Sequence, residues 1–241
     1  MEEKEINDTK LKDIKEIIEN YKSKAYMLND FVERSLNSMR WQGIGILMIL
    51  DASFTSVGLN YFNAVIPAIL KFKRKFYDTN EITNFHILSN YDLGKLKEVW
   101  KNERSWIVAK NISKVFSKYR NKDDRETLIY WAKTSSLNKF KNEEISKIKG
   151  VGIVTFQYLR IMGGIDTLMP DKIVIKFLDN VFSKSKTNII KHNIIEYIYD
   201  VENLLKKINI RPVEVTWISW LIDSEAKKIL TGKYNDVLNL I

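Results

Sequence analysis

The scarcity of helix-breaking residues constrains the fold of this chain more than any other feature of its sequence. Only three prolines and nine glycines occur among 241 residues. Between them, apolar side chains recur at intervals of three and four residues, as in the run Leu11, Ile14 and Ile18. This is the period of an amphipathic helix, and no segment shows the sustained alternation of a strand. The sequence therefore predicts an all-α fold.

Helices are predicted wherever this spacing persists, and the only long hydrophilic gap is 118–125. With 45% hydrophobic residues, a chain of this length can bury a core of one or two subdomains. The predicted helices are 11–18, 31–39, 60–76, 93–116 with a break near Asn102, 123–133, 143–148, 153–162, 172–182, 188–208 and 213–230.

The absence of cysteine excludes whole classes of chemistry. Disulfides, thiolate zinc sites, iron–sulfur clusters and catalytic thiols all require it. The chain has only two histidines, so we expect no multi-histidine metal centre. Any catalysis must use carboxylates, amines, hydroxyls or backbone amides.

The charge balance favours a polyanionic partner. The chain carries 39 basic and 30 acidic side chains, a formal charge of +9, and nucleic acid is the leading candidate. A bias toward lysine without functional meaning is the alternative. The first twenty residues lack the apolar core of an export signal, and the longest apolar stretch, 44–50, is too short to span a bilayer. We expect a cytoplasmic protein without a membrane partner.

The most informative segment is 143–177, where a short predicted helix ends at Gly150-Val151-Gly152 and another begins at once. The two glycines permit a tight turn, and the first amides of the second helix lack internal partners. Those amides can hold a phosphate, with Lys149 and Thr155 beside them. This is the pattern of a helix-hairpin-helix over about 143–163, a motif that binds the DNA backbone; an ordinary turn is the alternative.

A second signal follows the hairpin. Pro170-Asp171 precedes the amphipathic run 172–182, and Asp171 lies 19 residues after Gly152. Taken alone, Asp171 is a favoured N-cap. The joint pattern resembles the helix-hairpin-helix DNA glycosylase superfamily, in which a Gly/Pro-rich stretch and a catalytic Asp follow the hairpin. By this resemblance Asp171 is the catalytic residue.

The resemblance extends upstream of the hairpin. Residues 47–62 look like the segment that probes the lesion-containing duplex, with Ser53 where many members have Gln, and 98–115 look like the helix pair before the hairpin. The segments 55–62, 102–104 and 211–220 resemble those of the archaeal 8-oxoguanine glycosylase branch. The predicted base pocket, with a core position as the alternative for each residue, consists of Trp41, Gln42, Val154, Trp217 and Trp220.

The chain departs from the bifunctional members at one position. They have a Lys two residues after the last Gly of the hairpin, and its amine forms a Schiff base with the sugar. Here that residue is Val154. The resemblance therefore implies a monofunctional glycosylase, which releases the base and leaves the strand intact.

The resemblance also implies an architecture and a partner. We expect a helical barrel of 34–166, a second subdomain formed by 1–33 with 167–241, and a cleft between them holding Asp171. The protein would act as a monomer on duplex DNA with a flipped base, with no cofactor beyond a monovalent cation at the hairpin backbone. The alternatives are a non-catalytic DNA-binding module and, if the hairpin match is accidental, a basic scaffold that binds protein.

Overall fold

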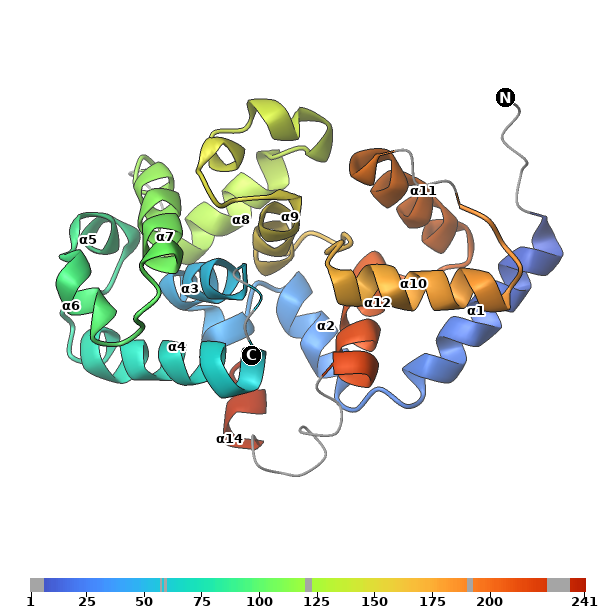
Figure 1. Cartoon of the computed structure of the whole chain (residues 1–241), viewed down its shortest axis with the longest axis horizontal. Helices are drawn as coiled ribbons and strands as arrows, with labels where there is room; N and C mark the ends of the chain where they lie inside the picture. The colour runs from blue at the N-terminus through green and yellow to red at the C-terminus, as the bar shows by residue number, and fades with distance from the viewer. Residues whose placement is uncertain (1–6, 57, 59, 120–122, 190–192, 225–234) are drawn as a thin grey trace. The chain divides into compact units, whose positions relative to one another are not determined.

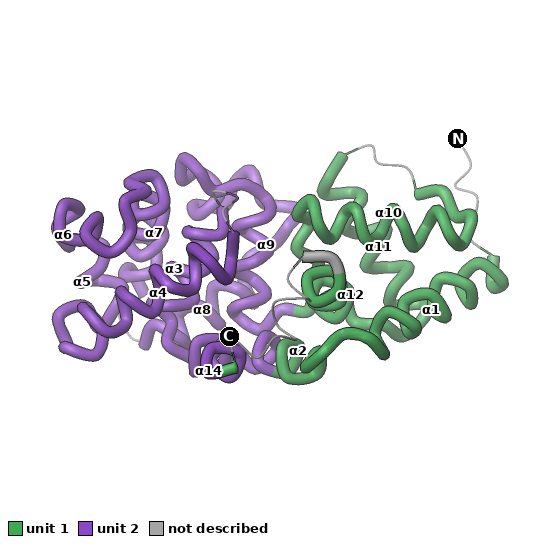
Figure 2. The backbone as a smooth tube through the Cα atoms, turned by 60° about the horizontal axis from the view of Figure 1, so that its bottom comes forward, with its two compact units in different colours: residues 1–33, 166–235 green, residues 34–165, 236–241 purple. Residues whose placement is uncertain are grey.

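A computed structural model confirms the all-α prediction (Figure 1). It describes residues 7–56, 58, 60–119, 123–189, 193–224 and 235–241, and no strand occurs in these ranges. No helix of the described ranges combines the length and apolar character needed to cross a bilayer. The described chain divides into two compact units, coloured separately in Figure 2. Unit 1 consists of 1–33 and 166–235, and unit 2 of 34–165 and 236–241.

Unit 1 is a bundle in which α1, α10 and α12 pack against one another. Two aromatic contacts join its sequence-distant parts: Tyr21 lies edge-on to Phe177 with ring centroids 5.1 Å apart, and Phe31 packs on Trp217 at 5.3 Å. The helices of unit 1 are α1 (Asp8–Lys22), most of α2 (Leu28–Leu36), α10 (Lys172–Lys184), α11 (Ile194–Lys207), α12 (Pro212–Ser219) and the π-helical η6 (Trp220–Ser224).

Unit 2 is built around α3 (Gly45–Thr55), which contacts α4, α7, α8 and α9 (Figure 1). Every residue of α3 from Gly45 to Phe54 is buried, as expected of a helix that is apolar on all sides. The other helices are α4 (Ile66–Phe72), α5 (Phe85–Asn90), α6 (Leu93–Lys97), α7 (Glu103–Phe116), α8 (Asp124–Thr134), α9 (Ile153–Met162) and α14 (Asn235–Leu238), with π-helical segments at Tyr61–Val65 and Lys73–Tyr77 and 3-10 segments at Arg40–Gly43, Leu137–Asn142 and Ile145–Lys147.

Side-chain caps explain why several of these helices begin where they do. Asn102 accepts a hydrogen bond from the Ser105 amide at the start of α7, so the predicted break near Asn102 is confirmed. Asp123 and Glu126 form a reciprocal capping box at the start of α8. Both caps use short polar side chains that are visible in the sequence.

The last six residues pack in unit 2, whereas we expected them in the terminal subdomain. Leu238 and Ile241 are buried, and the Leu240 carbonyl accepts a hydrogen bond from the Trp41 amide. The burial of these apolar side chains explains the difference. The predicted helix 213–230 is confirmed through residue 224, and its remainder lies outside the described residues.

A buried ion pair lies at the centre of unit 2. Asp51 of α3 and Arg40 are both fully buried, and Arg40 Nη2 lies 3.3 Å from Asp51 Oδ2. The same carboxylate oxygen accepts hydrogen bonds from Trp41 Nε1 at 2.7 Å and the Tyr61 hydroxyl at 2.8 Å. Arg40 Nη2 also donates to the hydroxyls of Tyr61 and Tyr158, at 3.0 and 3.3 Å. Burial opposes the charge of Arg40, but its carboxylate and hydroxyl neighbours hold its pKa above the ordinary value.

We expect Asp51→Asn to destabilise unit 2 by about 3–5 kcal/mol, because it leaves the Arg40 charge buried and uncompensated. Urea denaturation measures this. Glu103→Gln, which breaks the exposed Lys97–Glu103 ion pair, is the control and should cost less than about 1 kcal/mol. Equal costs for the two variants would show that the buried pair contributes no more than a surface one.

Candidate functional site

The helix predicted before the hairpin turn is shorter than expected. We predicted 143–148, whereas the structure has a 3-10 helix over Ile145–Lys147 only. Side chains compete for the backbone here: Ser146 Oγ donates to the carbonyls of Phe140 and Glu143, and the Glu143 carboxylate accepts from the Ser136 amide. Such local bonds offer the backbone an alternative to a regular helix.

The turn itself requires glycine at position 150. Gly150 has a φ of +103°, a conformation that other residues rarely adopt. A Cβ at this position would also lie 2.8 Å from Cγ2 of the buried Val108 on α7. The Val151 amide donates to the Ile148 carbonyl at 2.9 Å and closes the turn, while the Val151 side chain is buried. The turn at Gly150-Val151-Gly152 therefore packs closely against α7.

The helix after the turn, α9, begins without a side-chain cap. Gly152 is its N-cap and is exposed, and no side chain of the described chain accepts from its first amides. Uncapped amides at a positive helix end suit an anion, and the exposed Lys149 adds a cation. Thr155 is buried, so its side chain does not extend the predicted DNA-binding surface.

Asp171 is the N-cap of α10 in unit 1, and three donors fix its carboxylate. Oδ1 accepts from the amides of Ile173 and Val174 at 2.9 and 2.8 Å. Oδ2 accepts from the indole Nε1 of Trp220 at 2.9 Å. The side chain is half-buried, and its two oxygens thus have separate partners.

Two opposing effects act on the pKa of Asp171. Burial raises its pKa, and the hydrogen bonds from Val174, Trp220 and Ile173 act in the opposite direction. An N-cap position in the sequence indicates the amides and does not show the depth of the side chain, so only the second effect could be anticipated. The net result is a pKa above the ordinary value.

Three of the residues predicted to contact DNA or a base belong to the core. Ser53 is fully buried in α3, and its hydroxyl has no hydrogen-bond partner in the described chain. Trp41 is buried and donates to Asp51, and Trp217 is buried against Phe31. We therefore exclude these three side chains from the candidate site. The apolar surroundings that bury them come from distant segments, which the local pattern does not show.

The other predicted pocket residues lie in different places. Trp220, which we predicted in the base pocket, lies beside Asp171 in unit 1, and its indole donates a hydrogen bond to the Asp171 carboxylate. Val154 is half-buried in the first turn of α9 in unit 2. Gln42 is exposed, with a φ of +57°, and lines a pocket of unit 2.

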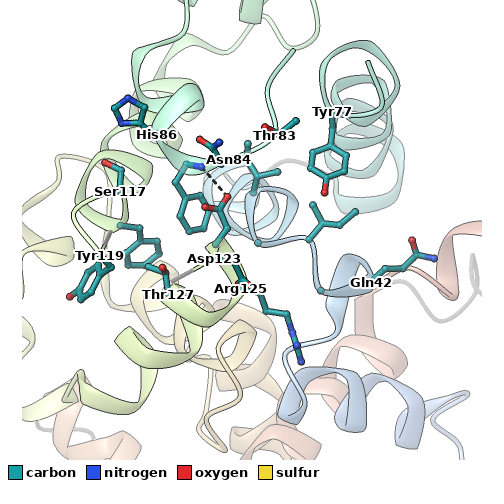
Figure 3. A pocket seen from close by; sticks show the side chains of 17 residues that line it. Gln42, Tyr77, Thr83, Asn84, His86, Ser117, Tyr119, Asp123, Arg125 and Thr127 are labelled. Carbon is teal, nitrogen blue, oxygen red and sulfur yellow. Dashed lines mark hydrogen bonds between the residues drawn. The ribbon is translucent and has the colours of Figure 1, made fainter. Parts of the chain in front are cut away.

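This pocket has a volume of about 650 Å³ and lies where α3, α5 and α8 begin. Figure 3 shows Tyr77 and Gln42 on one side of it, with Tyr119 and Ser117 on the other. Sequence reasoning missed this pocket, because its walls come from several separate segments. No group of three or more metal-ligating side chains occurs in the described ranges.

Asp124 is an acidic residue of the pocket lining whose pKa is raised. Its Oδ2 accepts from the Phe85 amide at 2.9 Å, which links the starts of α8 and α5. Burial raises the pKa of Asp124 to about 7, although the Phe85 hydrogen bond acts in the opposite direction. In the sequence Asp123-Asp124 reads as an ordinary acidic helix start, so only the contact with α5 distinguishes the second residue.

Comparisons of the chain with protein-family models, with curated proteins and with solved structures found no match.

We expect Asp124→Asn to stabilise the protein at pH 8 relative to the parent, and to have little effect near pH 4. Between pH 4 and about 7 the folded state binds the proton of Asp124 and the unfolded state does not, so the free energy of unfolding of the parent falls as pH rises. Denaturation at both pH values measures the difference. Asp123→Asn, an exposed neighbour that retains a capping oxygen, is the control and should show a smaller gain, because it removes only the neighbouring charge that adds to the effect of burial on the pKa of Asp124. A pH-independent effect of Asp124→Asn would contradict the raised pKa.

Proposed function

We propose that the protein is a DNA glycosylase resembling the helix-hairpin-helix superfamily, and that it hydrolyses the N-glycosidic bond of a damaged or mismatched base. The observation that carries the proposal is the carboxylate of Asp171, which three donors orient at the start of a helix. It follows a glycine turn with an uncapped helix start, at the interval the superfamily shows.

The hairpin turn supplies the means of holding DNA. Phosphate oxygens would accept hydrogen bonds from the first amides of α9, and Lys149 would add charge attraction. A grip of this kind does not read sequence, which suits an enzyme that searches for a rare lesion. The formal charge of +9 supports the same partner.

Asp171 would perform the chemistry. As the bond between C1′ and the base nitrogen breaks, its electron pair leaves with the base, which takes up a proton from solvent, and the sugar becomes cationic. The carboxylate stabilises this cation, accepts a proton from the water whose oxygen bonds to C1′, and returns that proton to solvent. The Trp220 indole and the α10 amides hold the carboxylate so that it need not reorganise during the reaction. The raised pKa also makes Asp171 a better proton acceptor.

Val154 supports base release without strand cleavage. It occupies the position of the superfamily's lyase Lys, and an alkyl side chain cannot form a Schiff base. The product would be an abasic site in an intact strand.

The proposal requires both units to engage one duplex, because the hairpin turn belongs to unit 2 and Asp171 to unit 1. We propose that a monomer in the cytoplasm does so with the base flipped from the stack. The resemblance to the archaeal 8-oxoguanine branch makes 8-oxoguanine the first lesion to test.

A non-catalytic DNA-binding protein is the second candidate. The observation favouring it is that capping alone accounts for both bonds to Asp171 Oδ1. In that case the hairpin would bind DNA and no base would be released. Activity measurements separate the two candidates.

We expect the parent protein to release a base from at least one duplex in a panel of single lesions, detected as alkali-labile abasic sites. Asp171→Asn should lower this rate on the order of 100-fold or more, because it removes the charge that stabilises the transition state. Binding to the duplex should be unchanged. Asp179→Asn, on the exposed side of the same helix, is the control and should retain activity.

Two outcomes would contradict this proposal. DNA binding without base release from any lesion would favour the non-catalytic candidate. Full activity in Asp171→Asn would show that another group performs the chemistry.

We expect no covalent adduct between the parent protein and substrate DNA under borohydride, because no imine forms at Val154. Val154→Lys should give a trace of trapped adduct, since a desolvated amine is partly deprotonated. The readout is a shifted band on a denaturing gel. A strong adduct from the parent would mean that another lysine is a nucleophile and that the protein also has lyase activity.

A further inference from the structure

Arg104 lies beside the hairpin turn, although it comes from a different helix. It occupies the first turn of α7 (Glu103–Phe116), and its Nε is 3.7 Å from the point where a Cβ on Gly150 would lie. Val108, four residues later and hence on the same face of α7, lies 2.8 Å from that point. One face of α7 therefore supports the turn and places a guanidinium next to it.

The guanidinium of Arg104 is available to bind a ligand. The side chain is exposed, and it makes no ion pair or hydrogen bond within the described ranges. Its neighbour Glu103 is paired with Lys97 at 2.8 Å, so the nearest acid in sequence is already neutralised. Two lysines at the turn, Lys147 and Lys149, are exposed as well.

We propose that Arg104 is a DNA-backbone contact, which binds a phosphate beside the one held by the hairpin amides. The inference rests on the proposed function and extends its binding surface to α7. A guanidinium can bind two phosphate oxygens at once, which an ammonium group cannot do with the same geometry. The absence of a side chain at Gly150 keeps this arrangement close, because a Cβ there would displace Val108, while Arg104 Nε lies at an ordinary contact distance of 3.7 Å from the same point.

The ligand class is a phosphodiester backbone of any sequence. Contacts to phosphates position a protein on the duplex and carry no base information. Arg104 should therefore contribute equally to binding of damaged and undamaged duplex, and it should leave the choice of base unchanged.

The test compares binding of an undamaged duplex by the parent, Arg104→Ala and Arg104→Lys over a series of salt concentrations. Arg104→Ala should weaken binding and lower the slope of log affinity against log salt by about 1, the value for one lost phosphate contact. Arg104→Lys should keep most of the slope and lose part of the affinity. Thermal melts verify that the variants are folded.

Arg74→Ala is the matched control. Arg74 is another exposed arginine of unit 2, and its loss removes the same charge. A general effect of net charge would weaken binding equally in both variants, and that result would overturn the proposal for Arg104.

The outcomes separate this inference from the proposed function. Unchanged binding in Arg104→Ala, in a protein that still releases bases, would overturn the Arg104 contact alone. A parent protein that binds no DNA at any salt concentration would overturn both. Weakened binding confined to Arg104→Ala would support the contact whether or not the protein is catalytic.

Discussion

The Asp51 carboxylate is the interaction on which the architecture of unit 2 depends. Its Oδ2 is bonded to groups from two further segments, Arg40 with Trp41 and the π-helical turn at Tyr61, and Arg40 extends the network to Tyr158 of α9. Because the interior has a low dielectric, each of these bonds is costly to leave unmade. The network fixes α9 to the central helix α3, and α9 begins at the Gly150-Val151-Gly152 turn. A charge buried in the core thus determines where the candidate DNA contact lies.

Helices that follow from a local spacing of apolar residues could be predicted from the sequence. Contacts that bring together residues far apart in the sequence could not. Leu11, Ile14 and Ile18 reveal their helix because the information lies within two turns. The Asp51 network joins residues that are 10 to 118 positions apart, and nothing local marks Trp41 as a donor to a buried carboxylate. For that reason we predicted Trp41 and Gln42 as part of a base pocket. The backbone of Trp41 is left-handed, with a φ of +54°, and it is held by the bonds of this residue to Asp51 and to the Leu240 carbonyl.

The candidate site shows the same division. The sequence marks Asp171, which we predict to be the catalytic residue, as a favoured N-cap when it is taken alone, and its bonds to Ile173 and Val174 follow from the local rule for helix starts. The partner of its other oxygen, Trp220, is 49 residues away and was expected to stack on a base. The prediction that Ser53 contacts DNA was wrong for a related reason. Its position came from a resemblance between segments, and such a resemblance does not show which face of α3 is covered by other helices.

The geometry of Asp171 also shows why a helix cap would suit the role that we propose for this carboxylate, the stabilisation of a cation. Burial would by itself favour the neutral acid, which has no charge to offer the developing sugar cation. Full exposure would keep the charge but surround it with water, which weakens its effect on the transition state. The α10 amides and the Trp220 indole allow the carboxylate to be half-buried while opposing the rise in its pKa. The base-releasing site that we propose would need both properties at one group, and capping supplies two of the three donors from backbone amides rather than from a charged side chain.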